Sequence, residues 1–210
     1  MRTSSIRLPA LSSQRSKYAA GLLCALFAAA LYLLPNRMPV LPQATLPLTA
    51  IDTAVPFWPA SGWLYASLYV LLLWTFVAMR DLGQASRFLY ACLFAQIAAA
   101  TIFVTFPTVY PRELFPLPEG THPLNAALVE FWRQLDAPAN CLPSLHVANT
   151  VLCLAVLATG RSWRCLCILG VLMCLSTLTF KQHYFVDIAA GAALGLATYV
   201  MFFRWGRIEL

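Results

Sequence analysis

The sequence predicts an all-α integral membrane protein, and three observations carry this prediction. First, 60% of the residues are hydrophobic and only 10% are charged, whereas an average soluble domain is about 25% charged. Second, apolar runs long enough to cross a bilayer recur along the chain. Third, basic residues gather on one side of these runs, as they do in the cytoplasmic loops of membrane proteins. We therefore expect a polytopic helix bundle.

Six membrane-spanning helices are expected, over residues 18–35, 60–79, 88–106, 143–160, 163–180 and 185–203. The apolar stretch of the first span is longer than the ~7–15 residues of a signal-peptide core. It is therefore expected to be a retained signal-anchor rather than a cleaved signal peptide. No internal repeat is evident, so residues 1–210 are expected to form one membrane-embedded domain, with its core at about residues 50–203.

The distribution of positive charge orients the six spans. If the N-terminus is cytoplasmic, ten basic residues lie on the inner side: Arg2, Arg7, Arg15, Lys17, Arg80, Arg87, Arg161, Arg164, Arg204 and Arg207. Only Arg37, Arg112, Arg133 and Lys181 then lie outside. This asymmetry predicts that both termini are cytoplasmic and that residues 107–142 and 181–184 face outward. We expect a bacterial inner membrane. No basic groove with interleaved aromatic residues suggests a nucleic-acid partner.

The longest outer loop contains the segment "PLNAALVEFWRQL". Its apolar residues recur at helical spacing, at Leu124, Leu128, Phe131, Trp132 and Leu135. This spacing predicts a short amphipathic helix that lies on the membrane surface. The sequence leaves two roles open for this helix, since it could only cap the bundle or could roof a site for lipid access.

The segment "CLPSLHVANT" places polar groups at the outer end of the fourth span. Pro143 suits the first turn of a helix, because its missing N–H would have no partner there. Free backbone N–H groups near Ser144 and Leu145, together with the helix dipole, are expected to form an anion site. Ser144 adds a hydroxyl and His146 adds an imidazole. This combination suits a phosphate group better than a metal ion.

A second polar segment, "KQHYFVD", precedes the sixth span. If that span begins near His183, then His183 and Asp187 stand four residues apart on one helical face. The carboxylate could then accept the proton of one ring nitrogen and leave the other free to attack. Lys181 would add a positive charge beside them. A single histidine at a membrane interface is more often structural than catalytic. Two histidines that both lie at outer ends of spans beside polar groups make a structural and a catalytic role about equally expected from residue chemistry alone.

The seven cysteines indicate no metal site. Cys165 and Cys167 lack a second pair of ligands at metal spacing. Most of the others fall within the expected spans, where cysteine is usually a small buried apolar residue.

Together, these two segments resemble motifs of the type 2 phosphatidic acid phosphatase superfamily. Pro143-Ser144-Leu145-His146 is similar to its Pro-Ser-x-His motif, and His183-x3-Asp187 followed by Gly191 is similar to its His-x3-Asp motif. The order of the motifs and their separation by one helical hairpin agree with the family. The resemblance covers roughly residues 50–200.

The resemblance implies a role for each matching residue. His183 would be the nucleophile that takes the phosphoryl group, and Asp187 would orient it. His146 would protonate the leaving oxygen and then act as the base for the acceptor. Ser144 would hold phosphate oxygens, a role that Lys181 and Arg112 would share as substitutes for missing family cations. The resemblance implies neither a metal nor a cofactor.

The chain also departs from the family pattern. It contains no Lys-Pro or Arg-Pro, so the usual Lys-x6-Arg-Pro motif is missing, and Ser176-Thr177 replaces the usual Ser-Arg. These departures, together with Leu145 and the string "KQHYFVD", resemble the branch that contains inositol phosphorylceramide synthase.

Three functions are therefore weighed. The leading expectation is a lipid phosphate phosphatase that acts on a phosphorylated lipid at the outer face through a phosphohistidine intermediate. The alternative is a phosphotransferase of the same fold that passes the phosphoryl-containing group to a lipid alcohol. A non-catalytic lipid transporter is less favoured, because transporters usually show internal repeats or broken helices. Phosphatidate, phosphatidylglycerophosphate, a polyprenyl phosphate and a sphingolipid all stay open as substrates, and so does the oligomeric state.

Overall fold

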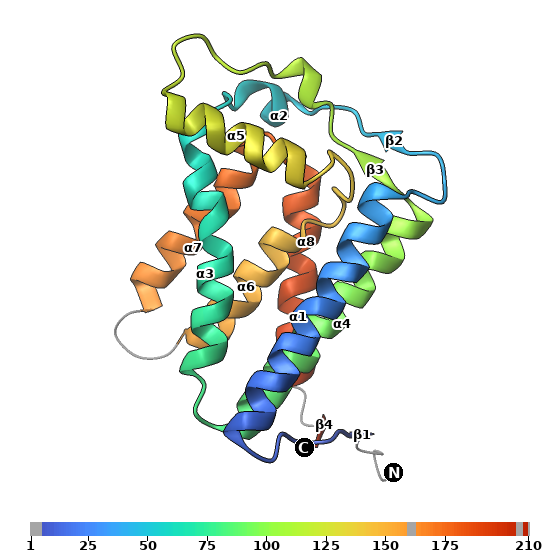
Figure 1. Ribbon diagram of the computed structural model, residues 1–210, viewed down its shortest axis with the longest axis vertical. Coiled ribbons are helices and arrows are strands. Elements are labelled where there is room, and N and C mark those ends of the chain that lie inside the picture. Colours follow the sequence, from blue (N-terminus) through green and yellow to red (C-terminus); the bar gives the residue numbers. More distant parts are fainter. Residues whose placement is uncertain (1–5, 159–162, 205–207, 210) are drawn as a thin grey trace.

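A computed structural model describes residues 6–158, 163–204 and 208–209, and in this part of the chain helices dominate (Figure 1). The α-helices are α1 (Gln14–Arg37), α2 (Ala50–Ala54), α3 (Gly62–Ala78), α4 (Leu82–Thr105), α5 (Pro123–Leu135), α6 (Leu145–Leu157), α7 (Trp163–Thr179) and α8 (Phe185–Tyr199). Two short 3₁₀-helices, η1 (Pro59–Ser61) and η2 (Arg112–Leu114), and a π-helical turn, η3 (Val200–Arg204), complete the helical elements. The predominantly helical fold expected from the sequence is confirmed.

Two pairs of very short parallel strands join distant segments. Strand β1 (Ile6–Arg7) pairs with β4 (Ile208–Glu209), and β2 (Ala44–Thr45) pairs with β3 (Thr108–Val109). The first pair brings the two described ends of the chain together at one end of the bundle (Figure 1). Helix α5 lies across the opposite end, above α3 and α6 (Figure 1).

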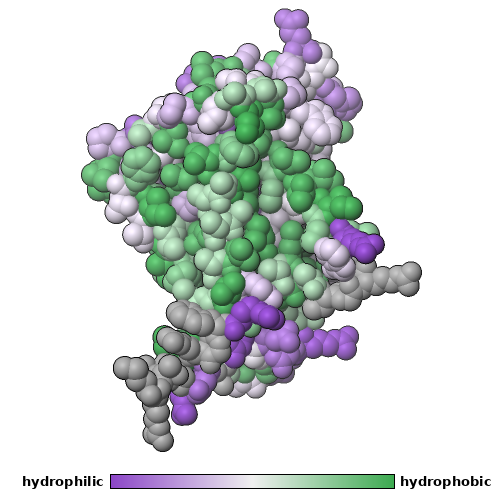
Figure 2. Space-filling view, turned by 180° about the vertical axis from the view of Figure 1, so that it is seen from behind, coloured by the Kyte–Doolittle hydropathy of each residue, from purple (hydrophilic) through white to green (hydrophobic). Residues whose placement is uncertain are grey.

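Long apolar helices make this chain a membrane protein. Four helical stretches are long and apolar enough to cross a bilayer, namely Gln14–Arg37, Pro59–Ala78, Leu82–Thr105 and Phe185–Arg204. Helices α6 and α7 have only 13 and 17 residues, fewer than the ~20 of a typical span. Figure 2 shows a wide hydrophobic band across the middle of one face, with hydrophilic residues gathered at its ends. A bundle of six spans stays a prediction. Arg2, Arg161, Arg207 and the last two residues of the span expected over 143–160 lie outside the described residues.

Close contact between α6 and α8 brings the two sequence motifs together. A Cβ atom on Gly191 would collide with the Ser144 carbonyl oxygen and lie 3.1 Å from the Val147 Cβ. Because glycine leaves this space empty, the backbone of α8 can approach the start of α6. The Ser144 N–H also donates a hydrogen bond to the Asp187 carbonyl oxygen, at 3.1 Å. The segments that carry His146 and His183 are therefore fixed against each other.

Replacing Gly191 with valine is expected to destabilise the fold by about 1–3 kcal/mol, the usual cost of overpacking a tight interface. The branched side chain would press against backbone atoms of Ser144, which have little freedom to move. The apparent melting temperature of the purified protein in detergent measures the effect. Ala193→Val, at an exposed position of the same helix, is the matched control, and equal melting temperatures for the two variants would contradict the prediction.

Candidate active site

A cavity of about 600 Å³ lies between α1 and α3 beneath α5, with α4 and α6 forming its other walls. Most of its lining is apolar. Its polar lining comes from three tyrosines and six other side chains: Tyr32, Tyr65, Tyr69, Gln96, Asp136, Asn140, His146, Asn149 and His183. Both histidines singled out in the sequence therefore reach one cavity, although 37 residues separate them in the chain.

The hydrogen bonds of His183 define which ring nitrogen is free. Its Nδ1 lies 3.0 Å from the Cys141 carbonyl oxygen and 3.3 Å from Asp187 Oδ2. A carbonyl oxygen only accepts hydrogen bonds, so Nδ1 must carry a proton. Neutral His183 then keeps its lone pair on Nε2, and its ring lines the cavity. This is the tautomer that a nitrogen nucleophile needs.

Asp187 contacts His183 through the turn that precedes α8, not through a shared face of the helix as expected. Helix α8 begins at Phe185, so His183 precedes the helix and the prediction of a shared helical face is wrong. Asp187 occupies the third helical position, from which its Oδ2 reaches back to accept the Tyr184 N–H at 2.9 Å. The same turn brings Oδ2 to His183 Nδ1. Asp187 is fully buried, and its Oδ1 has no hydrogen-bond partner in the described part of the chain.

His146 is held by the first turn of α3. Its Nε2 lies 2.9 Å from the Tyr65 carbonyl oxygen, so by the same argument Nε2 carries the proton and Nδ1 is the free nitrogen. Its ring stacks on the Tyr65 ring, with centroids 3.7 Å apart and planes 11° from parallel. Tyr69 contacts the imidazole edge-on. The ring orientation is thus fixed by one hydrogen bond and two aromatic contacts.

The start of α6 differs from the expectation by two residues. Pro143 lies before the helix, and Ser144 is its N-cap, with Oγ accepting the Val147 N–H at 3.3 Å. Serine is a strong N-cap residue because its oxygen satisfies one of the unpaired N–H groups of the first turn. The N–H groups of Leu145 and His146 make no backbone or side-chain hydrogen bond within the described residues. They remain available to an anion at the cavity.

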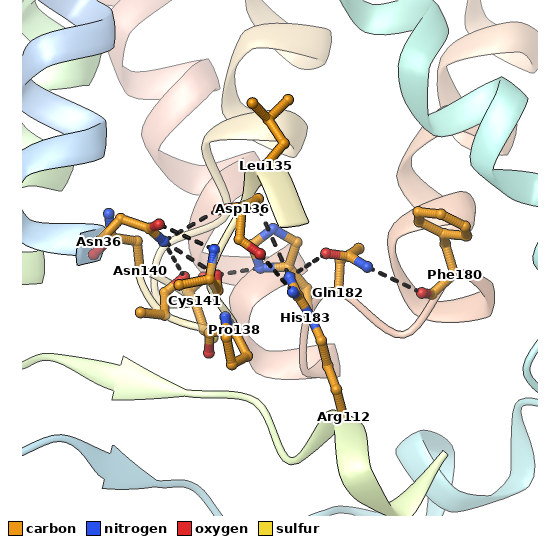
Figure 3. Close-up of polar contacts among 12 residues, drawn as sticks. Asn36, Arg112, Leu135, Asp136, Pro138, Asn140, Cys141, Phe180, Gln182 and His183 are labelled. Atoms are coloured by element: carbon orange, nitrogen blue, oxygen red, sulfur yellow. Dashed lines mark hydrogen bonds and ion pairs between the residues drawn. The ribbon is translucent and has the colours of Figure 1, made fainter. Parts of the chain in front are cut away.

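The Arg112 side chain lies close to Gln182 and His183 (Figure 3). Its Nη1 donates to the Asp136 carbonyl oxygen at 2.7 Å, and its Nη2 donates to Gln182 Oε1. Nη2 also lies 3.8 Å from Asp136 Oδ2. The guanidinium does not line the cavity itself. The expected contact of Arg112 with a phosphate is therefore not present in this conformation.

Asp136 was not found by sequence reasoning. Its Oδ1 accepts hydrogen bonds from Tyr32 Oη at 2.9 Å and from Asn36 Nδ2 at 3.1 Å (Figure 3). Burial raises the pKa of its carboxyl above the ordinary value, although the neighbouring Arg112 guanidinium opposes the shift. Asp136 ends α5, and no spacing motif in the sequence connects it with α1 or with His183. Only the folded chain reveals this contact.

Lys181 is not brought to the cavity. Its Nζ donates to the carbonyl oxygens of Asp52 at 2.8 Å and Val55 at 2.5 Å, and lies 4.2 Å from the centre of the Phe115 ring. Burial lowers the pKa of its ammonium, and the Asp52 carboxylate opposes that shift. In this conformation Lys181 anchors the end of α2, and a contact with phosphate would require it to leave both carbonyls.

Replacing Lys181 with methionine is therefore expected to lower stability more than catalysis. Two hydrogen bonds from a charged group are lost, each typically contributing about 1.5–3 kcal/mol, so the melting temperature in detergent should fall. Turnover per folded molecule should change less than about tenfold, since loss of a transition-state contact usually costs about 10²–10³ in rate. A loss of that size at unchanged melting temperature would instead place Lys181 on the phosphate.

One comparison with known proteins identifies the family. A family model described as the PAP2 superfamily matches residues 50–201. The chain belongs to the PAP2 superfamily. The comparisons with curated proteins and with solved structures give no significant match. PAP2 membership supports a phosphatase or phosphotransferase, and the matched range contains both histidines and Asp187. Helix α1, which supplies Tyr32 and Asn36, lies outside that range.

Proposed function

We propose that this PAP2 protein is a membrane-embedded lipid phosphate phosphatase that works through a phosphohistidine intermediate. One observation carries the proposal. His183 has Nδ1–H fixed by the Cys141 carbonyl and Asp187, which leaves Nε2 unprotonated at a cavity that also contains His146. An imidazole oriented in this way by a carboxylate is an activated nucleophile.

In the first step, His183 Nε2 attacks phosphorus and the bond between phosphorus and the lipid oxygen breaks. As positive charge develops on the ring, Asp187 Oδ2 stabilises the Nδ1–H group. The Nδ1 of His146 is unprotonated at the start, so it first takes a proton from the phosphate group of the bound lipid monoanion. The Nε2–H of His146 stays on the Tyr65 carbonyl, and its Nδ1–H passes a proton to the departing lipid oxygen. The products are a lipid alcohol and phosphorylated His183.

In the second step, an acceptor oxygen attacks the phosphorylated histidine. His146 Nδ1, now unprotonated, takes the proton of the attacking water. The bond between His183 Nε2 and phosphorus breaks. Inorganic phosphate takes this proton from His146 Nδ1 and leaves, and both histidines return to their starting protonation states. The N–H groups of Leu145 and His146, together with the dipole of α6, stabilise the phosphate oxygens. Ser144 supports them by capping α6, and contacts from Ser144 Oγ or Arg112 to the phosphate would require these side chains to leave their present partners.

The shape of the cavity favours a lipid substrate. Four aliphatic or aromatic residues of its lining are also exposed on the molecular surface: Leu33, Tyr69, Phe131 and Leu135. They come from α1, α3 and α5, so the cavity opens sideways between α1 and α3 under α5. We assign α5 the role of a roof at the membrane surface, where it lets a lipid enter from the bilayer.

We further propose a single domain of six spans with both termini cytoplasmic and the cavity facing the periplasm. The pairing of β1 with β4 puts the two described chain ends on one side, as an even number of crossings requires. Reporter fusions test this orientation. A reporter that is active only outside the cytoplasm should be active when it is fused after Glu119. After Leu210, only a reporter that is active in the cytoplasm should give a signal. The reverse pattern would contradict the proposal.

A second candidate is a phosphotransferase close to the inositol phosphorylceramide synthase branch. Leu145 within the first motif and the "KQHYFVD" segment favour it. Both candidates share the first step and differ only in the acceptor. Purified protein incubated with a lipid that carries labelled phosphate distinguishes them, because hydrolysis releases labelled phosphate and transfer yields a new labelled lipid. EDTA should change neither rate. If His183-dependent turnover of phosphorylated lipids is absent, both candidates fail.

A further inference from the structure

Asp52 of α2 is a buried carboxylate to which the proposed chemistry gives no role. It is 1% exposed and does not line the cavity. Its Oδ2 accepts hydrogen bonds from the Thr49 N–H at 2.8 Å and from the Thr49 hydroxyl at 2.7 Å, within the cap of α2. Its Oδ1 instead accepts the Phe185 N–H at 2.7 Å, across 133 positions of the chain. One carboxylate therefore joins α2 to the first turn of α8.

This contact completes the hydrogen bonding at the start of α8. The first N–H groups of a helix have no partner within the helix itself. Asp187 Oδ2 accepts the Tyr184 N–H and lies beside His183 Nδ1, whereas Asp52 accepts the next N–H, that of Phe185. Hydrogen bonds to an ionised carboxylate are stronger than those between neutral groups. Because Asp52 takes the Phe185 N–H, Asp187 Oδ2 is left to the Tyr184 N–H and to the proposed nucleophile.

Asp52 also holds the chain on the other side of His183. Lys181 Nζ donates to the Asp52 carbonyl oxygen at 2.8 Å, so Asp52 binds residues two positions before and two positions after His183. Lys181 has a φ of 55°, and a non-glycine residue keeps this conformation only where its surroundings hold it. The loop that carries His183 is therefore fixed on both sides by α2, which lies at the same end of the bundle as α5 (Figure 1).

We infer that Asp52 is a positioning residue for His183. The inference rests on the proposed function and adds a residue that acts on the nucleophile without touching the substrate. Attack on phosphorus requires the ring nitrogen to lie in line with the breaking bond. A displacement of about 1 Å, caused by a substitution far from the chemistry, can cost about 10²-fold in rate. Asp187 orients the ring relative to α8, whereas Asp52 fixes the start of α8 and the loop before it.

The experiment replaces Asp52 with serine, which removes the contact with α8 and keeps the cap of α2. Serine can cap from this position, since Ser16 at the third position of α1 accepts the Ser13 N–H at 3.0 Å. Its single hydroxyl does not also reach Phe185. For Asp52→Ser we expect kcat with a short-chain phosphatidic acid to fall about 10–100-fold. KM should change less than about threefold, because Asp52 does not line the cavity.

The conservative variant is Asp52→Asn. Its amide oxygen can still accept the Phe185 N–H, so kcat should recover to within about fivefold of the wild-type value. The rate at which labelled phosphate becomes bound to the protein within a single turnover should follow kcat across all variants. This rate reports the step in which His183 attacks, and a residue with a purely structural role would not change it per folded molecule.

Two controls separate positioning from stability. Thr53→Ala removes an exposed hydroxyl of α2 whose hydrogen bonds go to Thr49 and Ala50, and it should leave kcat within about twofold. Lys17→Met removes a buried ammonium that donates to carbonyl oxygens at the end of α3, at the opposite end of the bundle (Figure 1). It should lower the melting temperature in detergent but leave turnover per folded molecule within about twofold.

Three results would overturn the inference. The first is a folded Asp52→Ser protein that keeps kcat within about twofold of the wild-type value. The second is an equal loss in Asp52→Asn and Asp52→Ser, and the third is a loss that Lys17→Met reproduces at the same melting temperature. If Asp52→Ser does not fold, Asp52→Glu repeats the test with the same expectations, because glutamate caps well from the third helical position but displaces the carboxylate by one methylene group.

Failure of this inference and failure of the proposed function give different results. Normal wild-type turnover together with normal turnover by Asp52→Ser overturns the inference alone. If the wild-type protein turns over no phosphorylated lipid in a His183-dependent way, the proposed function is wrong and the inference fails with it.

Discussion

His183→Ala is expected to abolish turnover of phosphorylated lipids, with a loss on the order of 10⁴–10⁶-fold in kcat, as when the nucleophile of a covalent mechanism is removed. His146 is not expected to take over, because its Nε2 is bound to the Tyr65 carbonyl and it has no carboxylate partner among the described residues. Phosphate release from a soluble short-chain phosphatidic acid measures the effect.

The control for this variant is the fold. His183 contributes a hydrogen bond to Cys141 and lies 7% exposed, so its melting temperature in detergent must be measured beside the activity. His122→Ala is the matched control, since that third histidine caps the exposed start of α5, outside the cavity. A folded His183→Ala protein that retains even a tenth of wild-type turnover would show that another residue carries the phosphoryl group.

His146→Gln is expected to reduce kcat by about 10²–10⁴-fold for lipid substrates, the usual contribution of a general acid. The reason is that an alkoxide leaving group needs a proton. Nitrophenyl phosphate has a leaving group that needs none, so its first step should be nearly unaffected and phosphorylated enzyme should accumulate. Burst kinetics with this substrate measure both effects. Equal losses in the rate of the first step for the lipid and for nitrophenyl phosphate would contradict the role of His146 as the acid.

The sequence was sufficient to predict the helical membrane fold and to bring the two histidines into one site. Hydrophobic composition and the length of the apolar runs carry the first prediction, and the motif spacing around His146 and His183 carries the second. Helix boundaries were less accurate. Ser144 caps α6 and Tyr184 caps α8, because local hydrogen bonds of the first turn decide where a helix starts and hydropathy does not register them.

The surroundings of the histidines could not be predicted. Asp136 contacts Tyr32 across 104 positions of the chain, and such pairing depends on how α1 docks rather than on any local pattern. Lys181 has positive φ and turns its side chain toward the end of α2. Its charge suggested a phosphate contact, but a flexible four-carbon side chain can bind in many directions, and only the folded loop decides between them.

The central claim is that His183 carries the phosphoryl group, and trapping the intermediate tests it most directly. The protein is mixed with lipid that carries labelled phosphate, quenched in alkali within one turnover, digested and mapped by mass spectrometry. Phosphohistidine is stable in alkali and labile in acid, so the label should sit on the peptide that contains His183 and should disappear after acid treatment. A label on His146, or turnover of labelled lipid without any protein-bound label, would contradict the account.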